Sequence, residues 1–224
     1  PFSLPLSTFT YKSSLLFLGD NMLVDNMKDS LQTFFSLNKQ IELAKKLPGK
    51  AYFIPGNKDW ENGYTSLNNQ ENYINTYYKS DSFYPQKNCA IDVIVVSDSL
   101  VVITIDSQWY LANWDKYPGI NDDCHIRTRE EFFDEFDNLI NKYQNQTILI
   151  AMHHPLYSNA KHGGKFSIYD HIFPIKNVPL PFLGSFYTYV RKASGIFNQD
   201  LQNKKYITLI NRLKTGTQNL ENVF

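Results

Sequence analysis

The segment TILIAMHHP, residues 147–155, places a run of mostly apolar residues directly before two histidines and a proline. Two earlier segments follow the same pattern: FLGDN at residues 17–21 and IPGNKD at residues 54–59. In each segment, apolar residues typical of a buried strand stop at polar groups that can bind a metal. One such segment carries little information, but three in one chain indicate a sheet that delivers polar groups to a common edge.

The polar residues that follow these three strands are Asp20, Asn57 and His153, and Asp106 ends a further apolar run. In α/β proteins, ligands gather beyond the carboxyl ends of the strands. A carboxylate, an amide oxygen and an imidazole form a mixed oxygen and nitrogen donor set that suits manganese, iron or zinc. We therefore predict that Asp20, Asn57 and His153 converge on a metal site of a hydrolase. Asp106 is expected to have a hydrogen-bonding role at a strand end.

The composition is that of a folded α/β protein without a strong charge bias. The chain has 224 residues, 42% of them hydrophobic and 20% charged, which excludes a largely disordered protein. The formal net charge is zero and no cluster of basic residues stands out, so the sequence favours neither nucleic acid nor an acidic membrane surface as a partner. The longest apolar runs have strand length, well short of the ~20 residues of a membrane-spanning helix.

Strand and helix patterns alternate along most of the chain, which predicts an α/β fold with sheets covered by helices. The expected strands are residues 14–19, 51–55, 91–96, 100–105 and 147–152, with 91–105 forming a hairpin. The expected helices are residues 27–47, 67–78, 128–143 and 200–214. Residues 153–199 are rich in Pro, Gly, Ser and aromatic residues and are predicted to be a long irregular region within a single domain spanning 1–224.

The two cysteines, Cys89 and Cys124, both fall in predicted loops. We interpret them as free thiols, with a disulfide as the alternative, which would imply an oxidising compartment. Neither has a Cys or His at zinc-finger spacing. The sequence leaves the cytoplasm and the periplasm open as locations.

Three motifs together resemble the calcineurin-like metallophosphoesterases: Gly19-Asp20, Gly56-Asn57-Lys58-Asp59 and His153-His154-Pro155. The resemblance is closest to a bacterial, purple-acid-phosphatase-like subgroup, through the further runs IDSQW (105–109), GINDDC (119–124) and HGG (162–164). It implies a four-layer αββα sandwich of two mixed sheets flanked by helices. It also implies two divalent metal ions, and hydrolysis of a phosphate ester by a hydroxide that both metals activate.

Carried over by position, the resemblance assigns roles to five residues. Asp20 is expected to bridge the two metals, and Asn57 and His153 to bind the second one, with Asn57 also touching the phosphate. His162 is expected to contact the phosphate or to act as a general acid. Lys58 stands where the family has a histidine, and we expect it to contact the phosphate while shuttling protons less readily.

Two family motifs are missing from the sequence. No Asp-x-His precedes residue 14, and no Gly-His-x-His is present. We therefore expect a fragment truncated at both ends, with impaired activity. The alternative is a non-catalytic remnant that serves as a binding or interaction module. A serine hydrolase is a weak third option, because the chain has no Gly-x-Ser-x-Gly.

Overall fold

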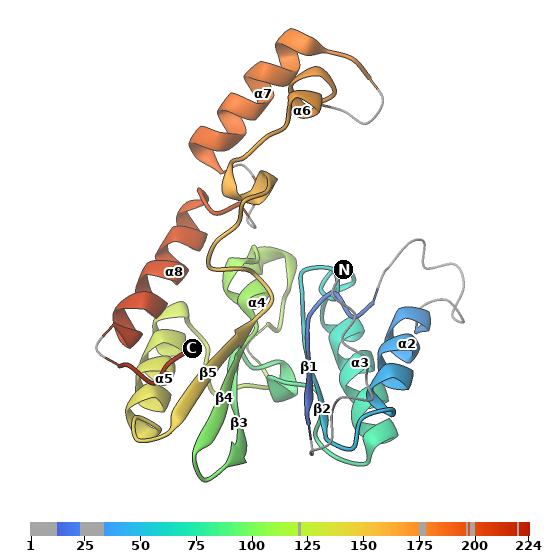
Figure 1. The fold of residues 1–224 in the computed structure, drawn as a ribbon, viewed down its shortest axis with the longest axis vertical. Coiled ribbons are helices and arrows are strands. Elements are labelled where there is room, and N and C mark those ends of the chain that lie inside the picture. Colours follow the sequence, from blue (N-terminus) through green and yellow to red (C-terminus); the bar gives the residue numbers. More distant parts are fainter. Residues whose placement is uncertain are drawn as a thin grey trace. The chain divides into compact units, whose positions relative to one another are not determined.

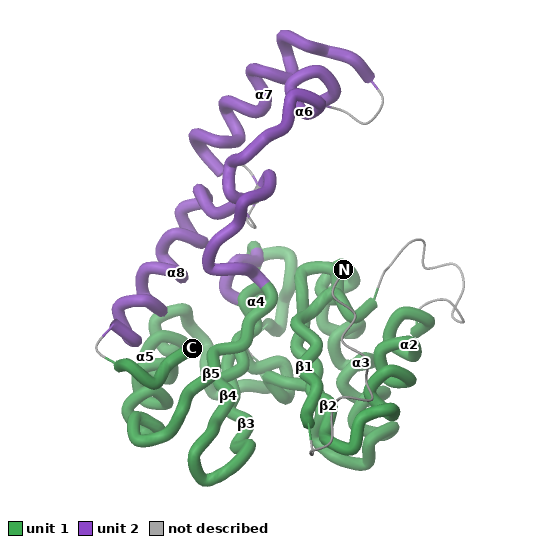
Figure 2. The backbone as a smooth tube through the Cα atoms, viewed as in Figure 1, with its two compact units in different colours: residues 1–109, 113–153, 220–224 green, residues 110–112, 154–219 purple. Residues whose placement is uncertain are grey.

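The computed structural model describes residues 13–22, 34–120, 122–174, 178–195, 197, 200–218 and 220–224. The chain divides into two compact units, which Figure 2 shows in different colours. The first unit comprises Pro1–Trp109, Asn113–His153 and Leu220–Phe224, and the second comprises Tyr110–Ala112 and His154–Asn219.

Two parallel strands, β1 (Leu15–Leu18) and β2 (Ala51–Ile54), pair in the first unit. Phe17 lies opposite Phe53, and their stacked rings, with centroids 4.6 Å apart, support this register. Every residue of β2 is buried, as expected of a parallel strand covered on both faces. Because the strands run in the same direction, both deliver their following loops to the same edge.

The helices α2 (Phe35–Ala44) and α3 (Gly63–Tyr78) lie beside this strand pair in Figure 1. α2 occupies part of the predicted helix 27–47; residues 27–33 of that prediction lie outside the described residues. α3 begins earlier than the predicted residue 67 and therefore follows closely after the loop that carries Asn57.

A second sheet of the first unit contains β3 (Ile91–Ser97), β4 (Leu100–Ile105) and β5 (Thr147–Met152), in that order. β3 and β4 form the predicted antiparallel hairpin, and β5 pairs parallel to β4. Val223 adds a parallel bridge to Ile148 on the other side of β5. The sheet is therefore mixed, and β5 runs in a direction that brings His153 to its carboxyl end.

The amphipathic helix α5 (Arg129–Lys142) contacts β3, and its start is fixed by a capping box. Thr128 accepts a hydrogen bond from the backbone N–H of Glu131 at 3.1 Å, and the Glu131 carboxylate accepts one from the Thr128 N–H at 3.3 Å. The buried face of the helix carries Phe132, Phe133, Phe136, Leu139 and Ile140. Three shorter elements in the same part of the chain are η2 (Gln86–Asn88), α4 (Ser107–Leu111) and η3 (Trp114–Lys116).

Residues from both sheets share a hydrophobic cluster in the first unit. Tyr52 of β2 packs with Ile94 of β3, Val102 of β4 and Ala151 of β5. All four side chains are buried, so the two sheets are held together by removal of apolar surface from water. This α/β arrangement, with two sheets and flanking helices, agrees with the predicted fold class.

Cys89 and Cys124 form a disulfide, with their Cα atoms 5.2 Å apart. The interpretation as free thiols is therefore wrong, and the alternative holds. Cys89 follows η2 and Cys124 lies in the loop before α5, so only the tertiary fold brings the two loops together. Nothing in the spacing of the two residues reveals that contact.

The second unit contains η4 (Lys161–Gly163), α6 (Ile168–Ile172), α7 (Pro181–Ser194) and α8 (Lys204–Thr217). The prediction that residues 153–199 are irregular is wrong for α7 in particular. Pro181 stands in the first turn, where its missing N–H is not needed, and Gly195 ends the helix in the left-handed conformation. Gly184 reads as a helix breaker, but it lies where a Cβ would collide with the carbonyl of His171.

A buried ion pair closes the turn between α7 and α8. Arg191 donates to both carboxylate oxygens of Asp200, at 2.9 and 2.6 Å. Asn203 caps α8 by accepting a hydrogen bond from the Lys205 N–H at 3.0 Å, so the helix begins later than the predicted residue 200. None of the helices in the described part of the chain is both long and apolar enough to cross a membrane.

We expect the disulfide to contribute about 2–4 kcal/mol to the free energy of unfolding, because it closes a loop with a sequence separation of 35 in the unfolded chain. The double variant Cys89→Ser/Cys124→Ser should therefore unfold at lower urea concentration than the oxidised protein. Reduction of the wild type with a phosphine should lower the midpoint by a similar amount, and should leave the variant unchanged. Equal midpoints for all three samples would contradict the expectation.

Candidate metal centre

Three loops bring the predicted metal ligands together at one edge of the first unit. Asp20 follows β1, Asn57 follows β2, and His153 follows β5. The Nε2 atom of His153 lies 3.1 Å from Oδ1 of Asn57 and 3.5 Å from Oδ1 of Asp20. The three side chains therefore present their donor atoms to a common point.

The backbone carbonyl of Leu18 determines the tautomer of His153. Nδ1 of His153 lies 2.7 Å from this oxygen, which can only accept a hydrogen bond, so Nδ1 carries the proton. Nε2 of a neutral ring then directs a lone pair towards the two oxygens of Asp20 and Asn57. A ring nitrogen, a carboxylate oxygen and an amide oxygen are the kinds of donor that bind manganese, iron or zinc. A backbone carbonyl that orients a metal-binding histidine in this way is a common feature of metal sites.

The separations between these donor atoms fit a bound divalent cation. Metal–oxygen and metal–nitrogen bonds of ~2.0–2.2 Å place neighbouring ligand atoms roughly 3–3.5 Å apart. The observed distances of 3.1 and 3.5 Å lie at this spacing without rearrangement of the side chains. The spacing of these atoms is therefore compatible with a shared cation.

Glycines allow the three loops to approach this closely. A Cβ added to Gly19 would lie 2.6 Å from Nδ1 of His153, and one added to Gly56 would lie 2.5 Å from Oδ1 of Asp20. Gly19 has φ +91° and Asp20 has φ +54°, so the chain turns sharply as it leaves β1. The Asp20 carboxylate also accepts a hydrogen bond from the N–H of Lys58, at 3.0 Å.

The buried carboxylate of Asp59 ties the first two loops together. It accepts hydrogen bonds from the backbone N–H groups of Asn21 at 3.2 Å, Met22 at 3.0 Å and Gly56 at 2.7 Å. Burial raises the pKa of Asp59, while these N–H donors lower it. The sequence alone predicts no role for Asp59; its position at the end of the Gly-Asn-Lys-Asp run is the only signal there.

A family model described as calcineurin-like phosphoesterase matches residues 12–184. The chain belongs to this family. A search of curated proteins finds no match, and a search of solved structures finds none either. Membership indicates a metal-dependent phosphoesterase, a hydrolase whose substrates are phosphate esters. The match extends over the loops that carry Asp20, Asn57 and His153, and it includes residues of both compact units.

Lys58, which replaces the family histidine, is engaged with a neighbouring acid. Its Nζ lies 2.5 Å from Oε1 of Glu61, and both side chains are largely exposed. The ion pair holds the ammonium group at the start of α3, so a contact with phosphate would require the pair to open. The His162 side chain lies outside what the structure describes, so its predicted role stays a prediction.

His154 and Asp106 have buried positions that differ from those of the candidate ligands. His154 belongs to the second unit, where its ring packs edge-on against Tyr206 at 5.8 Å. Asp106 accepts hydrogen bonds from the indole of Trp60 at 2.9 Å and from the backbone N–H of Trp109 at 3.0 Å. Burial raises the pKa of Asp106 to about 7, although both of these donors lower it.

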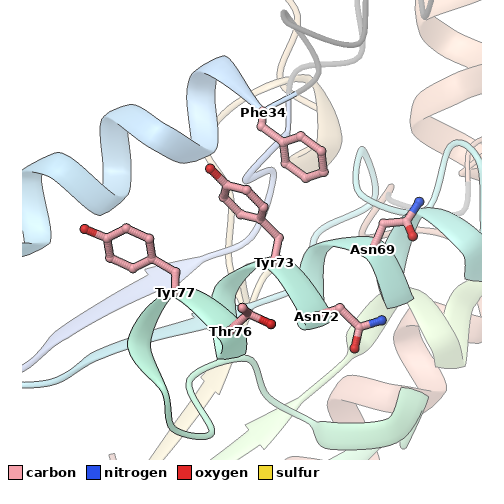
Figure 3. A pocket seen from close by; sticks show the side chains of 6 residues that line it. All are labelled: Phe34, Asn69, Asn72, Tyr73, Thr76 and Tyr77. Carbon is pink, nitrogen blue, oxygen red and sulfur yellow. The ribbon is translucent and has the colours of Figure 1, made fainter.

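Two other features of the first unit are separate from the candidate ligands. A hollow of about 520 Å³ beside α3 is lined by Phe34, Asn69, Asn72, Tyr73, Thr76 and Tyr77, as Figure 3 shows. His125 lies close to the sulfurs of Cys89 and Cys124, but the disulfide bond already uses both sulfurs. We assign neither feature to the metal centre.

We expect Gly56→Ala to weaken metal binding by at least about tenfold, because the new methyl group would displace the Asp20 carboxylate and the His153 ring. The matched control is Gly216→Ala, which lies inside α8, where alanine is favoured over glycine. Isothermal titration with Mn²⁺ measures both affinities. Wild-type affinity in Gly56→Ala would show that the close approach of the loops is not required.

The raised pKa of Asp106 predicts a pH-dependent stability. Between about pH 4 and pH 7 the folded protein holds a proton on Asp106 that the unfolded chain releases, so this group makes the free energy of unfolding fall as pH rises through that window. The contribution is at most about 1.4 kcal/mol per pH unit. Urea unfolding at pH 5 and pH 8 should show a smaller loss of stability in Asp106→Asn than in the wild type. Equal losses in both proteins would contradict the assignment.

Proposed function

We propose that this protein hydrolyses phosphate esters at a centre of two divalent cations, to which Asp20, Asn57 and His153 contribute. The single observation that carries the proposal is the convergence of Nε2 of His153 with the side-chain oxygens of Asn57 and Asp20, at 3.1 and 3.5 Å. The donor set suits manganese, iron or zinc. When bound, the cations would acidify water and neutralise charge on the phosphate.

Each residue of the proposed centre has a distinct task. Asp20 would hold both cations, because a carboxylate has two oxygens and this residue follows β1 at the edge of the sheet. His153 binds through Nε2, since Nδ1 is held by Leu18. Asn57 supplies an uncharged oxygen, which leaves more positive charge on the cation to attract a phosphate. We also propose that the fold is a four-layer αββα sandwich. The hydrophobic cluster shared by the two sheets supports this proposal.

We place Lys58 and His162 on the substrate side of the proposed centre. Lys58 contacts the phosphate once it leaves Glu61, and it is a weaker proton donor at neutral pH than the histidine that other members of the family have there. His162 contacts the phosphate or protonates the leaving group. The proposed activity is accordingly low on generic aryl phosphates.

The alternative proposal is a non-catalytic module that binds a metal or a partner without turning over substrate. The observation that favours it is the Lys58–Glu61 ion pair, which occupies the position of the family's proton donor. Both proposals are compatible with a bound metal, so turnover rather than metal content separates them.

We expect the protein to bind Mn²⁺, and His153→Ala to lower the affinity by about 10–100-fold because it removes one of the three converging donors. The control is His125→Ala, an exposed histidine that belongs to none of the three loops. Metal content after dialysis, measured by mass spectrometry, and titration calorimetry give the readout. Equal metal content in the wild type and His153→Ala would overturn the proposed centre.

Turnover separates the two proposals. The wild type should hydrolyse aryl phosphates far more slowly than the ~1–10³ per second of ordinary enzymes, and Lys58→His should raise the rate while metal content stays constant. The matched control is Lys46→His, which changes an exposed lysine outside the centre in the same way. No turnover in either protein, with the metal bound, would favour the non-catalytic module.

A further inference from the structure

The face of helix α7 that is buried in the second unit carries small and polar residues, the kind that usually face solvent. Its buried residues are Gly184, Thr188 and Arg191, which recur every three to four positions and therefore lie on one side of the helix. Gly184 allows close approach to the carbonyl of His171, and Thr188 hydrogen-bonds to the His171 ring at 3.1 Å. The small and polar residues of α7 thus form its contact with α6, which lies beside it in Figure 1.

The opposite side of α7 exposes large apolar residues, which we call the aromatic stripe. Phe182 is 90% exposed, Leu183 60%, Phe186 67% and Tyr189 72%. Phe182 and Leu183 are adjacent, and Phe186 and Tyr189 follow at intervals of three, so all four lie on one continuous face. Single exposed apolar side chains are ordinary on protein surfaces, but a stripe of four on one helix is typical of a surface that binds a membrane, another protein or a ligand.

A basic hollow of about 670 Å³ adjoins the aromatic stripe. Its lining includes Lys165, His171, Ser185, Thr188, Tyr189 and Lys192. Tyr189 belongs both to the hollow and to the stripe, so the two features are continuous. Ammonium groups together with hydroxyl groups form a suitable lining for a phosphate, whose oxygens accept hydrogen bonds from both.

Charge in this part of the chain is positive, although the whole chain is neutral. Residues 154–200 contain five Lys and Arg against two Asp. Both acids are neutralised within the unit, Asp170 by Lys161 and Asp200 by Arg191. Burial raises the pKa of Asp170, but the hydrogen bonds from Lys161 and Ser167 outweigh it and lower this pKa to about 2. Asp170 is therefore ionised at neutral pH, and its ion pair with Lys161 persists. The zero net charge of the sequence therefore concealed a local positive surface.

We propose that α7 lies flat on a bilayer containing anionic phospholipids, with the aromatic stripe among the upper acyl chains and lipid phosphates in the basic hollow. Helices of this type, with Phe and Leu on one face and basic residues beside it, bind in the plane of the interface rather than across the bilayer. A second copy of the chain is a poorer occupant, because it would bring the same positive charges to the same surface. The inference is independent of the proposed metal centre.

Flotation with vesicles tests this inference on the full chain. The protein should float with phosphatidylglycerol-containing vesicles, and Phe182→Ser/Phe186→Ser should lower the partition coefficient at least about tenfold, because two aromatic side chains lose their apolar environment. The matched control is Phe35→Ser/Leu43→Ser, which removes two residues of α2 that are 61% and 41% exposed. No flotation of the wild type, or equal losses in both double variants, would overturn the inference.

The basic hollow has its own variant. Lys165→Gln/Lys192→Gln should lower binding to anionic vesicles about tenfold at low salt and should leave the weaker binding to zwitterionic vesicles unchanged. Glycerol phosphate at millimolar concentration and matched ionic strength should compete poorly with the vesicles. Complete displacement by it would show a site for free phosphates instead of a membrane surface.

Two further measurements decide the remaining outcomes. Phe186→Trp preserves the apolar stripe, so its fluorescence should shift to the blue on vesicles and be quenched by brominated acyl chains; an unchanged spectrum would overturn the inference even if the serine variant misfolds.

Light scattering without lipid should show no self-association; a dimer that Phe182→Ser/Phe186→Ser abolishes would identify a second copy as the occupant. His153→Ala should float like the wild type, so a failure of the metal centre and a failure of membrane binding are distinguishable.

Discussion

The close contact of three loops, permitted by two glycines, is the constraint on which the candidate centre depends. Gly19 and Gly56 leave no room for a Cβ between the turn after β1, the turn after β2 and the ring of His153. The buried carboxylate of Asp59 holds the first two turns together through three backbone N–H groups. Because the parallel pairing of β1 and β2 aligns the ends of these strands, the loops that carry Asp20 and Asn57 leave the sheet at the same edge.

The chemistry of the centre follows from the way this scaffold limits hydrogen bonding. The Leu18 carbonyl accepts a hydrogen bond from Nδ1 of His153, so Nε2 is the ring nitrogen that faces Asp20 and Asn57. This orientation leaves Nε2 as the atom through which His153 can bind a cation. The same region contains a departure from its family, since Lys58 pairs with Glu61 at the position of a proton donor. In the proposed centre, metal binding and turnover can therefore be tested separately.

In the second unit, helix α7 buries small and polar residues and exposes large apolar ones. A helix that buries glycine, threonine and an ion-paired arginine gains little from the hydrophobic effect within its own unit. The apolar residues that could provide that stabilisation face outwards and adjoin lysines and hydroxyl groups. If the metal centre acts on phosphate esters while α7 binds anionic lipid, the protein would work where phosphorylated molecules are concentrated at a surface.

The sequence by itself determined the α/β class, the five described strands and which three side chains, Asp20, Asn57 and His153, follow strands and converge. Runs such as residues 147–152 have a strand pattern that local interactions alone favour, and the motif order in the chain fixes which residues end the strands. The sequence did not determine α7, because its proline, glycine and aromatic residues are typical of an irregular segment. Only the structure shows that Pro181 starts a helix and that Gly184 packs against the carbonyl of His171 in α6. The Cys89–Cys124 bond, the roles of Asp59 and Asp106, and the outward face of α7 were decided by tertiary structure alone. Each depends on distances between segments far apart in the chain, which periodicity and composition do not encode.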